Sequence, residues 1–131
     1  MSSTNVELAR RVVGAINDRD VDGFVALVAD GFEWLTPVAN TQPTTYYGED
    51  GVRGFFQDAR RWQRIEARVE EFRDLGDRVL VLGELSWGHS RGGSLDVVGP
   101  LFSLIHFDGG KVKRIETYRD AKEAFAAAGL A

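Results

Sequence analysis

The sequence predicts an α+β fold in which helices pack on one face of a curved antiparallel sheet. Three observations support this fold class. The chain has 131 residues, 44% of them hydrophobic and 27% charged, which is enough for one domain with its own core. Helical periodicity is confined to the first half and the C-terminal end. Between them, four strand-like segments follow one another without a helix, an order typical of α+β proteins.

Two N-terminal helices are predicted from their caps. The pattern Thr4-x-x-Glu7 is a capping box that opens the first helix, and the polar break that starts at Asn17 closes it. Asp20 is a preferred cap for a second, short helix, and Gly31 is a preferred stop. These signals predict a helical hairpin before the first strand.

A short strand, a loop and the most amphipathic helix follow. Residues 32–36 alternate as a strand, and residues 37–50 hold two prolines and a glycine, which predicts a loop. Within that loop the pair Tyr46-Tyr47 is expected to lie over an apolar surface. Apolar residues at helical spacing predict a third helix from Gly51 to about Ile65.

The second half predicts a meander and a last helix. The strands are expected at residues 66–74, 78–88, 95–107 and 111–119, separated by turns such as Asp108-Gly109-Gly110. Asp120-x-x-Glu123 is a second capping box, and Gly129 ends the helix that it opens.

The two central strands of this meander are apolar on both faces. In residues 79–87 and 101–107, odd and even positions alike carry Val, Leu, Ile or Phe. The helices can cover only one face, so the other needs a second cover. The simplest cover is another copy of the chain, which predicts a homodimer through the outer sheet face. The alternative is that the twisted sheet curls over its own outer face.

Composition excludes several function classes. With a net charge of −4, the chain is a poor nucleic-acid binder. It has no cysteine and two histidines far apart in the sequence, so no metal site is expected. No apolar run approaches the length of a membrane span, and no secretory signal is visible. No cofactor fingerprint is present, and we expect a cytoplasmic protein without a cofactor.

Several segments resemble the nuclear transport factor 2-like superfamily, in its SnoaL-like branch of polyketide cyclases and ketosteroid isomerase-like proteins. They are the segment from Asn17 to Asp30, the start of the third helix at Gly48-Glu49-Asp50-Gly51-Val52, the hairpin from Phe107 to Val112 with Tyr118-Arg119-Asp120, and the tail from Glu123 to Leu130. The resemblance covers nearly the whole chain, residues 1–131. It implies a single SnoaL-like domain and a cone-shaped, cystatin-like curved sheet, with three N-terminal helices on its concave face and a deep apolar pocket.

The best-known mechanisms of the superfamily lack their residues here. The ketosteroid isomerase base aligns with Thr36, and the oxyanion donors align with Val12 and Ser103. The acidic and basic groups of the limonene epoxide hydrolases align with Gly83, Leu85 and Thr117. The resemblance therefore implies neither of those two reactions.

The resemblance implies a ligand pocket that is apolar and aromatic, with a few hydroxyl groups. The residues expected to line it are Trp34, Thr36, Tyr46, Phe56, Trp62, Trp87, Ser103 and Thr117. For the tryptophans, filling the core is an equally acceptable reading.

Two groups are candidates for moving a proton in such a pocket. His89 follows Trp87 with the same parity, and its ordinary pKa range suits acid–base work; the alternative is a solvated loop histidine. Asp96 lies on the strand after the Gly-rich connection, from which it can reach the predicted rim. The resemblance implies an aspartate as the acid–base group, because SnoaL-like cyclases are expected to use one. His106, Glu84 and Glu116 fall on the outward parity and are expected to be structural or interface charges.

Two functions remain open from the sequence. The first is a cofactor-independent cyclase or isomerase that moves a proton on an apolar polycyclic or polyketide-like molecule. The second is a protein that binds such a ligand in the same pocket without catalysis. A third reading, a pure dimerisation partner, requires a filled core.

Overall fold

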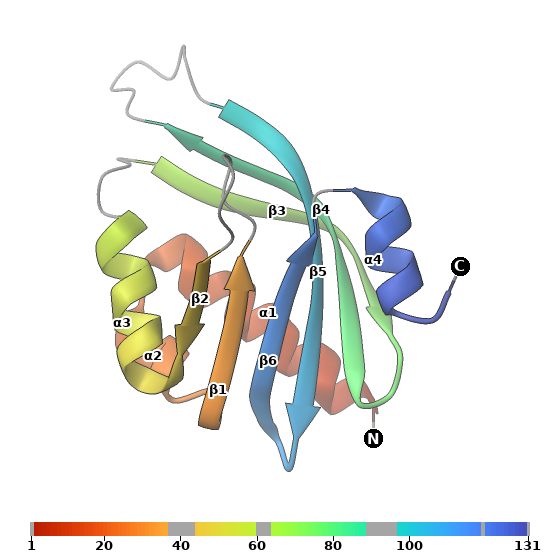
Figure 1. Ribbon diagram of the computed structural model, residues 1–131, viewed down its shortest axis with the longest axis horizontal. Helices are drawn as coiled ribbons and strands as arrows, with labels where there is room; N and C mark the ends of the chain where they lie inside the picture. The colour runs from red at the N-terminus through yellow and green to blue at the C-terminus, as the bar shows by residue number, and fades with distance from the viewer. Residues whose placement is uncertain (1, 37–43, 60–63, 89–96, 119, 131) are drawn as a thin grey trace.

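The structure is a computed structural model, and it describes residues 2–36, 44–59, 64–88, 97–118 and 120–130 (Figure 1). The elements are α1 (Ser2–Asp18), α2 (Val21–Val25), β1 (Val28–Thr36), β2 (Thr44–Tyr47), α3 (Gly48–Ala59), β3 (Arg64–Asp74), β4 (Arg78–Gly88), β5 (Val97–Asp108), β6 (Lys111–Tyr118) and α4 (Ala121–Ala127). The strands form one six-stranded sheet in the order β2-β1-β6-β5-β4-β3. The sheet is curved and does not close. The predicted α+β class is confirmed.

One pairing departs from the predicted antiparallel sheet. β3, β4, β5 and β6 form the expected antiparallel meander. β1, however, runs parallel to β6, with Trp34 opposite Ile115. The reason is the path of the chain: after β2 and α3 the meander starts at the far edge of the sheet, and its last strand returns beside β1 in the same direction.

The predicted loop over residues 37–50 contains a strand and the start of a helix. Thr44–Tyr47 forms β2, antiparallel to β1, while residues 37–43 lie outside the described residues. Gly48 has a φ of +63°, which lets the chain turn from strand to helix. A Cβ on Gly51 would lie 2.6 Å from the carbonyl carbon of Tyr46. Glycine there lets α3 fold back directly onto β2.

Two other predicted boundaries were wrong. The second helix ends at Val25, not near Gly31, and β1 already begins at Val28. α3 ends at Ala59, not near Ile65, which belongs to β3 and pairs with Trp87. β-branched Val28 and Ile65 favour strands, and sheet pairing outweighs the helical periodicity that continued past them.

The helices α1, α2 and α3 cover the concave face of the sheet. α1 contacts β3 and β4, and α3 contacts β1 and β2 (Figure 1). Val79 and Val81 of β4 and Ile105 and Phe107 of β5, all odd-numbered, are buried there. Phe24 of α2 is fully buried in the same core. The predicted packing of the N-terminal helices is confirmed.

The outer, convex face is partly covered by the C-terminal helix. Leu80 and Leu104 are fully buried in a second, smaller core with Ala124 and Ala128 of α4. The sequence predicted this helix, with Asp120 accepting a hydrogen bond from the Glu123 amide at 2.8 Å, but did not place it. Part of the outer face expected to need a second copy is therefore covered by the chain itself.

Candidate functional site

A cluster of aromatic rings fills the concave side between β1, α2 and α3. The indole of Trp34 is stacked between two phenylalanines, with ring centroids 4.8 Å from Phe24 and 3.9 Å from Phe55. Phe56 contacts Phe24 edge-on at 5.8 Å. Trp34 and Phe56 are 4% and 6% exposed. Both faces of the Trp34 indole are therefore occupied by protein, and only its edge remains for any other contact.

The two tyrosines of β2 have different surroundings. Tyr46 packs edge-on against Phe55 at 5.7 Å, and its hydroxyl donates a 2.6 Å hydrogen bond to Asp58 Oδ2. Tyr47 points to the other side of the sheet and is 62% exposed. The expectation that both tyrosines lie over an apolar surface is correct for Tyr46 and wrong for Tyr47, because neighbouring strand residues face opposite sides.

A hydroxyl pair lies on the concave face farther along the sheet. The Ser103 and Thr117 hydroxyl oxygens are 3.0 Å apart, and Ser103 is 7% exposed. The residues two positions away on the same strands, Leu101, Ile105 and Ile115, are apolar. Each hydroxyl has further hydrogen-bonding capacity, so the pair can bind a ligand oxygen in apolar surroundings.

For two other expected lining residues, Thr36 and Trp87, the strand register gives the position of the backbone. Thr36 pairs in register with Thr44, and its neighbour Leu35 pairs with Glu116, so the Thr36 backbone lies next to Thr117. Trp87 lies in β4 opposite Val97 and Ile65. Nothing is described of the Thr36 and Trp87 side chains.

Three further site predictions, Trp62, His89 and Asp96, lie outside the described residues. The strand ends that flank His89 and Asp96 belong to one end of the sheet, because Gly88 pairs with Arg64 and Trp87 pairs with Val97. The described ends of β1 and β2 do not reach that end of the sheet, because Thr36 and Thr44 lie level with Thr117 and Ser103.

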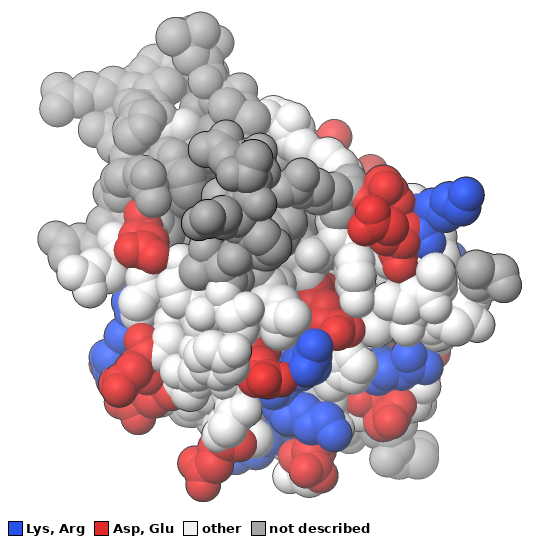
Figure 2. Space-filling view, in the orientation of Figure 1, with Lys and Arg blue, Asp and Glu red and all other residues white. Residues whose placement is uncertain are grey.

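The convex face carries a network of charged side chains. Glu116 accepts hydrogen bonds from His106 Nε2 at 2.9 Å and Arg114 Nε at 3.0 Å. Arg114 also donates to Glu33 Oε1 at 2.7 Å. Figure 2 shows acidic and basic side chains intermixed over the lower part of this face. The predicted outward position of His106 and Glu116 is confirmed.

The network shifts two pKa values. Burial raises the pKa of Glu116, but the hydrogen bond and charge of His106, with the charge of Arg114, outweigh it, so that the pKa is lowered. Burial and the neighbouring Glu116 carboxylate raise the pKa of Tyr118. The Glu116 carboxylate is thus held ionised as a structural acceptor.

Within the described residues, no three His, Asp or Glu side chains lie together in an arrangement that could hold a metal ion. No helix in the same ranges is both long and apolar enough to cross a membrane.

The sequence analysis did not identify Phe24 and Phe55 of the aromatic cluster, or Asp58 beside it, as site residues. Phe24 and Phe55 lay on the apolar helix faces that the periodicity identified, so a signal for their burial was present. Their stacking on Trp34 depends on how α2 and α3 approach β1, which spacing within one helix does not encode. The Tyr46–Asp58 hydrogen bond required knowing that residues 44–47 form a strand.

Comparison with solved structures gives the same fold. TerC, co-crystallised with polyporic acid, superimposes with a TM-score of 0.76 at 22% identity, covering 96% of this chain and 98% of TerC. An NTF2-like protein of unknown function from Burkholderia pseudomallei superimposes with a TM-score of 0.75 at 21% identity, covering 94% of this chain and 95% of that protein. A putative polyketide cyclase from Xanthomonas campestris pv. campestris superimposes with a TM-score of 0.72 at 18% identity, covering 96% of this chain and 97% of that protein.

The comparison with curated proteins gave no match. The family model of the SnoaL-like domain matches residues 9–115, from the middle of α1 to β6. This range includes the aromatic cluster and every predicted site residue except Thr117. The chain therefore belongs to the SnoaL-like domain family, and its fold is that of the NTF2-like protein from Burkholderia pseudomallei.

Proposed function

We propose that this protein binds a small, flat, apolar molecule of polycyclic or polyketide-like type on the concave side of its sheet. The observation that carries the proposal is the Ser103–Thr117 hydroxyl pair, 3.0 Å apart among apolar neighbours. Such a pair orients a carbonyl or hydroxyl oxygen, while apolar walls hold the ring system. The stacked rings around Trp34 lie beside this pair, because Trp34 stands opposite Ile115 on β6.

The solved structures support a ligand of this class. TerC was co-crystallised with polyporic acid, and the Xanthomonas protein is described as a putative polyketide cyclase. Their identity to this chain is low, so they support the proposal through the shared fold.

Proton transfer is the reaction that such a pocket suits. We propose His89 or Asp96 as the group that moves the proton, in a cofactor-independent cyclase or isomerase. The described residues around the hydroxyl pair, including Val81, Leu101 and Ile115, offer no acid or base. The alternative is a binding protein that uses the same site without catalysis, and those apolar neighbours favour it.

Binding is tested by thermal shift with polyporic acid and a panel of polycyclic ketones. A ligand at about 100 times its Kd stabilises the folded state by about 2.7 kcal/mol. Thr117→Val and Ser103→Ala should weaken binding, and Thr45→Val, a change of the same size on β2, should not. If none of the compounds raises the melting temperature, the proposal is wrong.

Catalysis is tested separately by following deuterium exchange next to a ligand carbonyl in D₂O. An enzyme exchanges this proton faster than buffer does, and His89→Ala or Asp96→Asn removes the acceleration. Binding without acceleration supports the non-catalytic alternative.

A homodimer through the outer sheet face and a cytoplasmic location are also part of the proposal. Leu82 and Phe102 remain partly exposed on that face beside α4, so apolar surface is left for a second copy. Light scattering measures the mass in solution. A monomer at all accessible concentrations contradicts this part.

A further inference from the structure

The Ser103–Thr117 hydroxyl pair lies in a row of concave residues that crosses the sheet. Ser103 stands opposite Val81 on β4, and Val81 stands opposite Phe72 on β3. On its other side Ser103 stands opposite Thr117 on β6, and their hydroxyl oxygens are 3.0 Å apart. The row thus carries two neighbouring hydroxyl groups beside apolar side chains.

The two hydroxyls satisfy each other only in part. Whichever of them donates, the bond between Ser103 and Thr117 uses one of their two hydrogens and leaves the second available. Among the described residues, neither hydroxyl has another hydrogen-bond partner. The oxygen that donates within the pair also keeps its lone pairs. The pair therefore offers a donor on one oxygen and an acceptor on the other, and the two oxygens can exchange these roles.

The described surroundings of the pair are uncharged. Arg10 of α1 lies over the Phe72 ring at 4.7 Å, but it is exposed beside the edge strand β3. Arg19 donates to the carbonyl oxygen of Ala59 at the end of α3. No Lys or Arg of the described residues hydrogen-bonds to either hydroxyl. The concave positions around the pair are apolar: Trp34, Val81, Leu101, Ile105 and Ile115.

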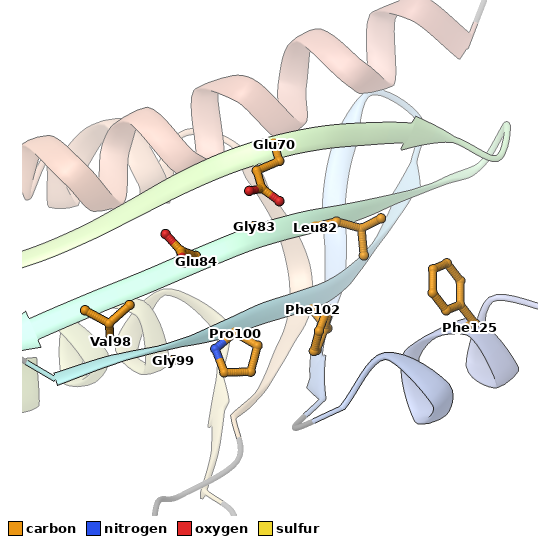
Figure 3. Close-up of a pocket in the computed structure, with 9 residues that line it drawn as sticks. All are labelled: Glu70, Leu82, Gly83, Glu84, Val98, Gly99, Pro100, Phe102 and Phe125. Carbon is orange, nitrogen blue, oxygen red and sulfur yellow. The ribbon is translucent and has the colours of Figure 1, made fainter.

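Charged side chains of the same strands project from the opposite, convex face. Arg114 on β6 stands in register with His106 there. The convex face also carries a groove of about 500 Å³ beside α4. Figure 3 shows the carboxylates of Glu70 and Glu84 at this groove, whose lining also includes Leu82, Phe102 and Phe125. Alternation along the strands therefore separates these charges from the hydroxyl pair.

We propose that the pair selects its ligand through an uncharged hydroxyl group, that of a phenol or an enol, and excludes the ionised form of the same group. This inference rests on the proposed function and names the polar group that the site takes. The ligand oxygen accepts the free hydrogen of one side-chain hydroxyl, and the ligand hydroxyl donates to the other. Each of the three hydroxyls then both donates and accepts.

Other oxygen groups fit the pair less well. A ketone or an ether accepts the free hydrogen but donates nothing in return, so one hydrogen bond is lost. A phenolate or a carboxylate brings a negative charge, and the uncharged surroundings offer one neutral donor in place of the water that the anion loses. The site therefore favours the protonated form of an acidic ligand.

Three phenanthrenes that differ in one substituent test this preference at pH 7. The Kd of 9-phenanthrol should be about three to ten times lower than that of 9-methoxyphenanthrene, and at least about a hundred times lower than that of phenanthrene-9-carboxylate. Fluorescence titration of each ligand measures the three values. A methoxy or carboxylate compound that binds as tightly as the phenol overturns the inference while ligand binding stands. If none of the three binds, the inference is wrong, and the thermal-shift panel decides the proposed function separately.

The pKa of the bound phenol gives a second readout. Phenols ionise at about pH 10, as tyrosine does. With the protein at ten times its Kd, exclusion of the ionised form should raise the pKa of 9-phenanthrol by about one unit, which its absorbance measures. An unchanged or lowered pKa would show that the site accepts the anion, and would overturn the inference.

Variants of the pair connect the preference to these two residues. Ser103→Ala and Thr117→Val each leave one hydroxyl, which cannot donate to a phenol and accept from it at once, so 9-phenanthrol and 9-methoxyphenanthrene should bind about equally. The comparison is made within one variant, and a general loss of affinity does not imitate it. Thr45→Val on β2 should keep the wild-type preference. A preference that survives in both pair variants overturns the assignment to the pair.

Discussion

Gly83 has no side chain because the neighbouring strand leaves no room for one. β3 has an irregular register between Val69 and Glu71, where it faces Gly83. A Cβ at Gly83 would overlap the carbonyl oxygen of Arg68, and a backbone atom moves less easily than a flexible side chain. The glycine therefore allows the bulge that bends the sheet at this point.

Gly83→Ala is expected to destabilise the fold by about 1–3 kcal/mol, as overpacking does in well-packed sites. Urea unfolding at constant pH measures the change. Gly14→Ala is the control, because Gly14 is in α1 and no atom lies within 4 Å of its added Cβ. It should be neutral or stabilising by about 0.5–1 kcal/mol. Equal destabilisation by both substitutions would argue against the close approach.

The lowered pKa of Glu116 makes stability depend on pH. A carboxyl whose pKa is lower in the folded than in the unfolded state stabilises the fold above its unfolded pKa, about 4.3 for Glu. That contribution to stability is lost as the pH falls through the pKa that Glu116 has in the folded state.

Glu116→Gln should therefore destabilise the protein at pH 7 and lose this effect as pH falls below about 4. The side chain is partly exposed, so we expect roughly 1 kcal/mol or less at pH 7. Chemical unfolding of both proteins from pH 3 to 7 measures it. Glu66→Gln is the control, because Glu66 is exposed. A constant difference between wild type and Glu116→Gln across this range contradicts the prediction.

At the scale of elements, α4 depends on its cap and on a small apolar contact. Asp120 accepts the Glu123 amide hydrogen bond, and Ala124 and Ala128 pack on Leu80 and Leu104. A helix of 7 residues is too short to be stable alone.

Asp120→Ala should cost about 1 kcal/mol and speed hydrogen exchange across α4, leaving β4 protected. Asp120→Asn, which keeps a cap acceptor, should behave like wild type. Mass spectrometry of deuterium uptake in the peptides of α4 and β4 distinguishes these cases. Unchanged exchange in Asp120→Ala would show that packing alone holds the helix.

β2 and the first turn of α3 were not predicted from the sequence, which indicated a loop there. The strand over residues 78–88 was predicted with its observed ends, because alternation and turn residues are local signals. The strand at Thr44–Tyr47 exists through its pairing with β1 and its contact with Gly51. The pairing with β1 is not a local signal, and the prolines and the glycine of residues 37–50 indicated a loop instead.

For the whole molecule, the resemblance and the binary pattern predicted the fold class and the face on which the N-terminal helices pack. They did not predict the parallel β1–β6 pair or the position of α4, since both follow from the path of the chain. Of the predicted lining residues, Trp34 and Phe56 are buried in the ring cluster, and Ser103 and Thr117 are brought together. The proton-transfer candidates His89 and Asp96 stay predictions.

The most direct test of ligand binding on the concave side is an NMR titration with polyporic acid that follows backbone amide shifts and intermolecular NOEs. The proposal predicts NOEs from the ligand rings to the Thr117 methyl and Leu101, with shifts at Ser103. Shifts confined to the convex groove around Phe102 and Phe125, or none at saturating ligand, would contradict it.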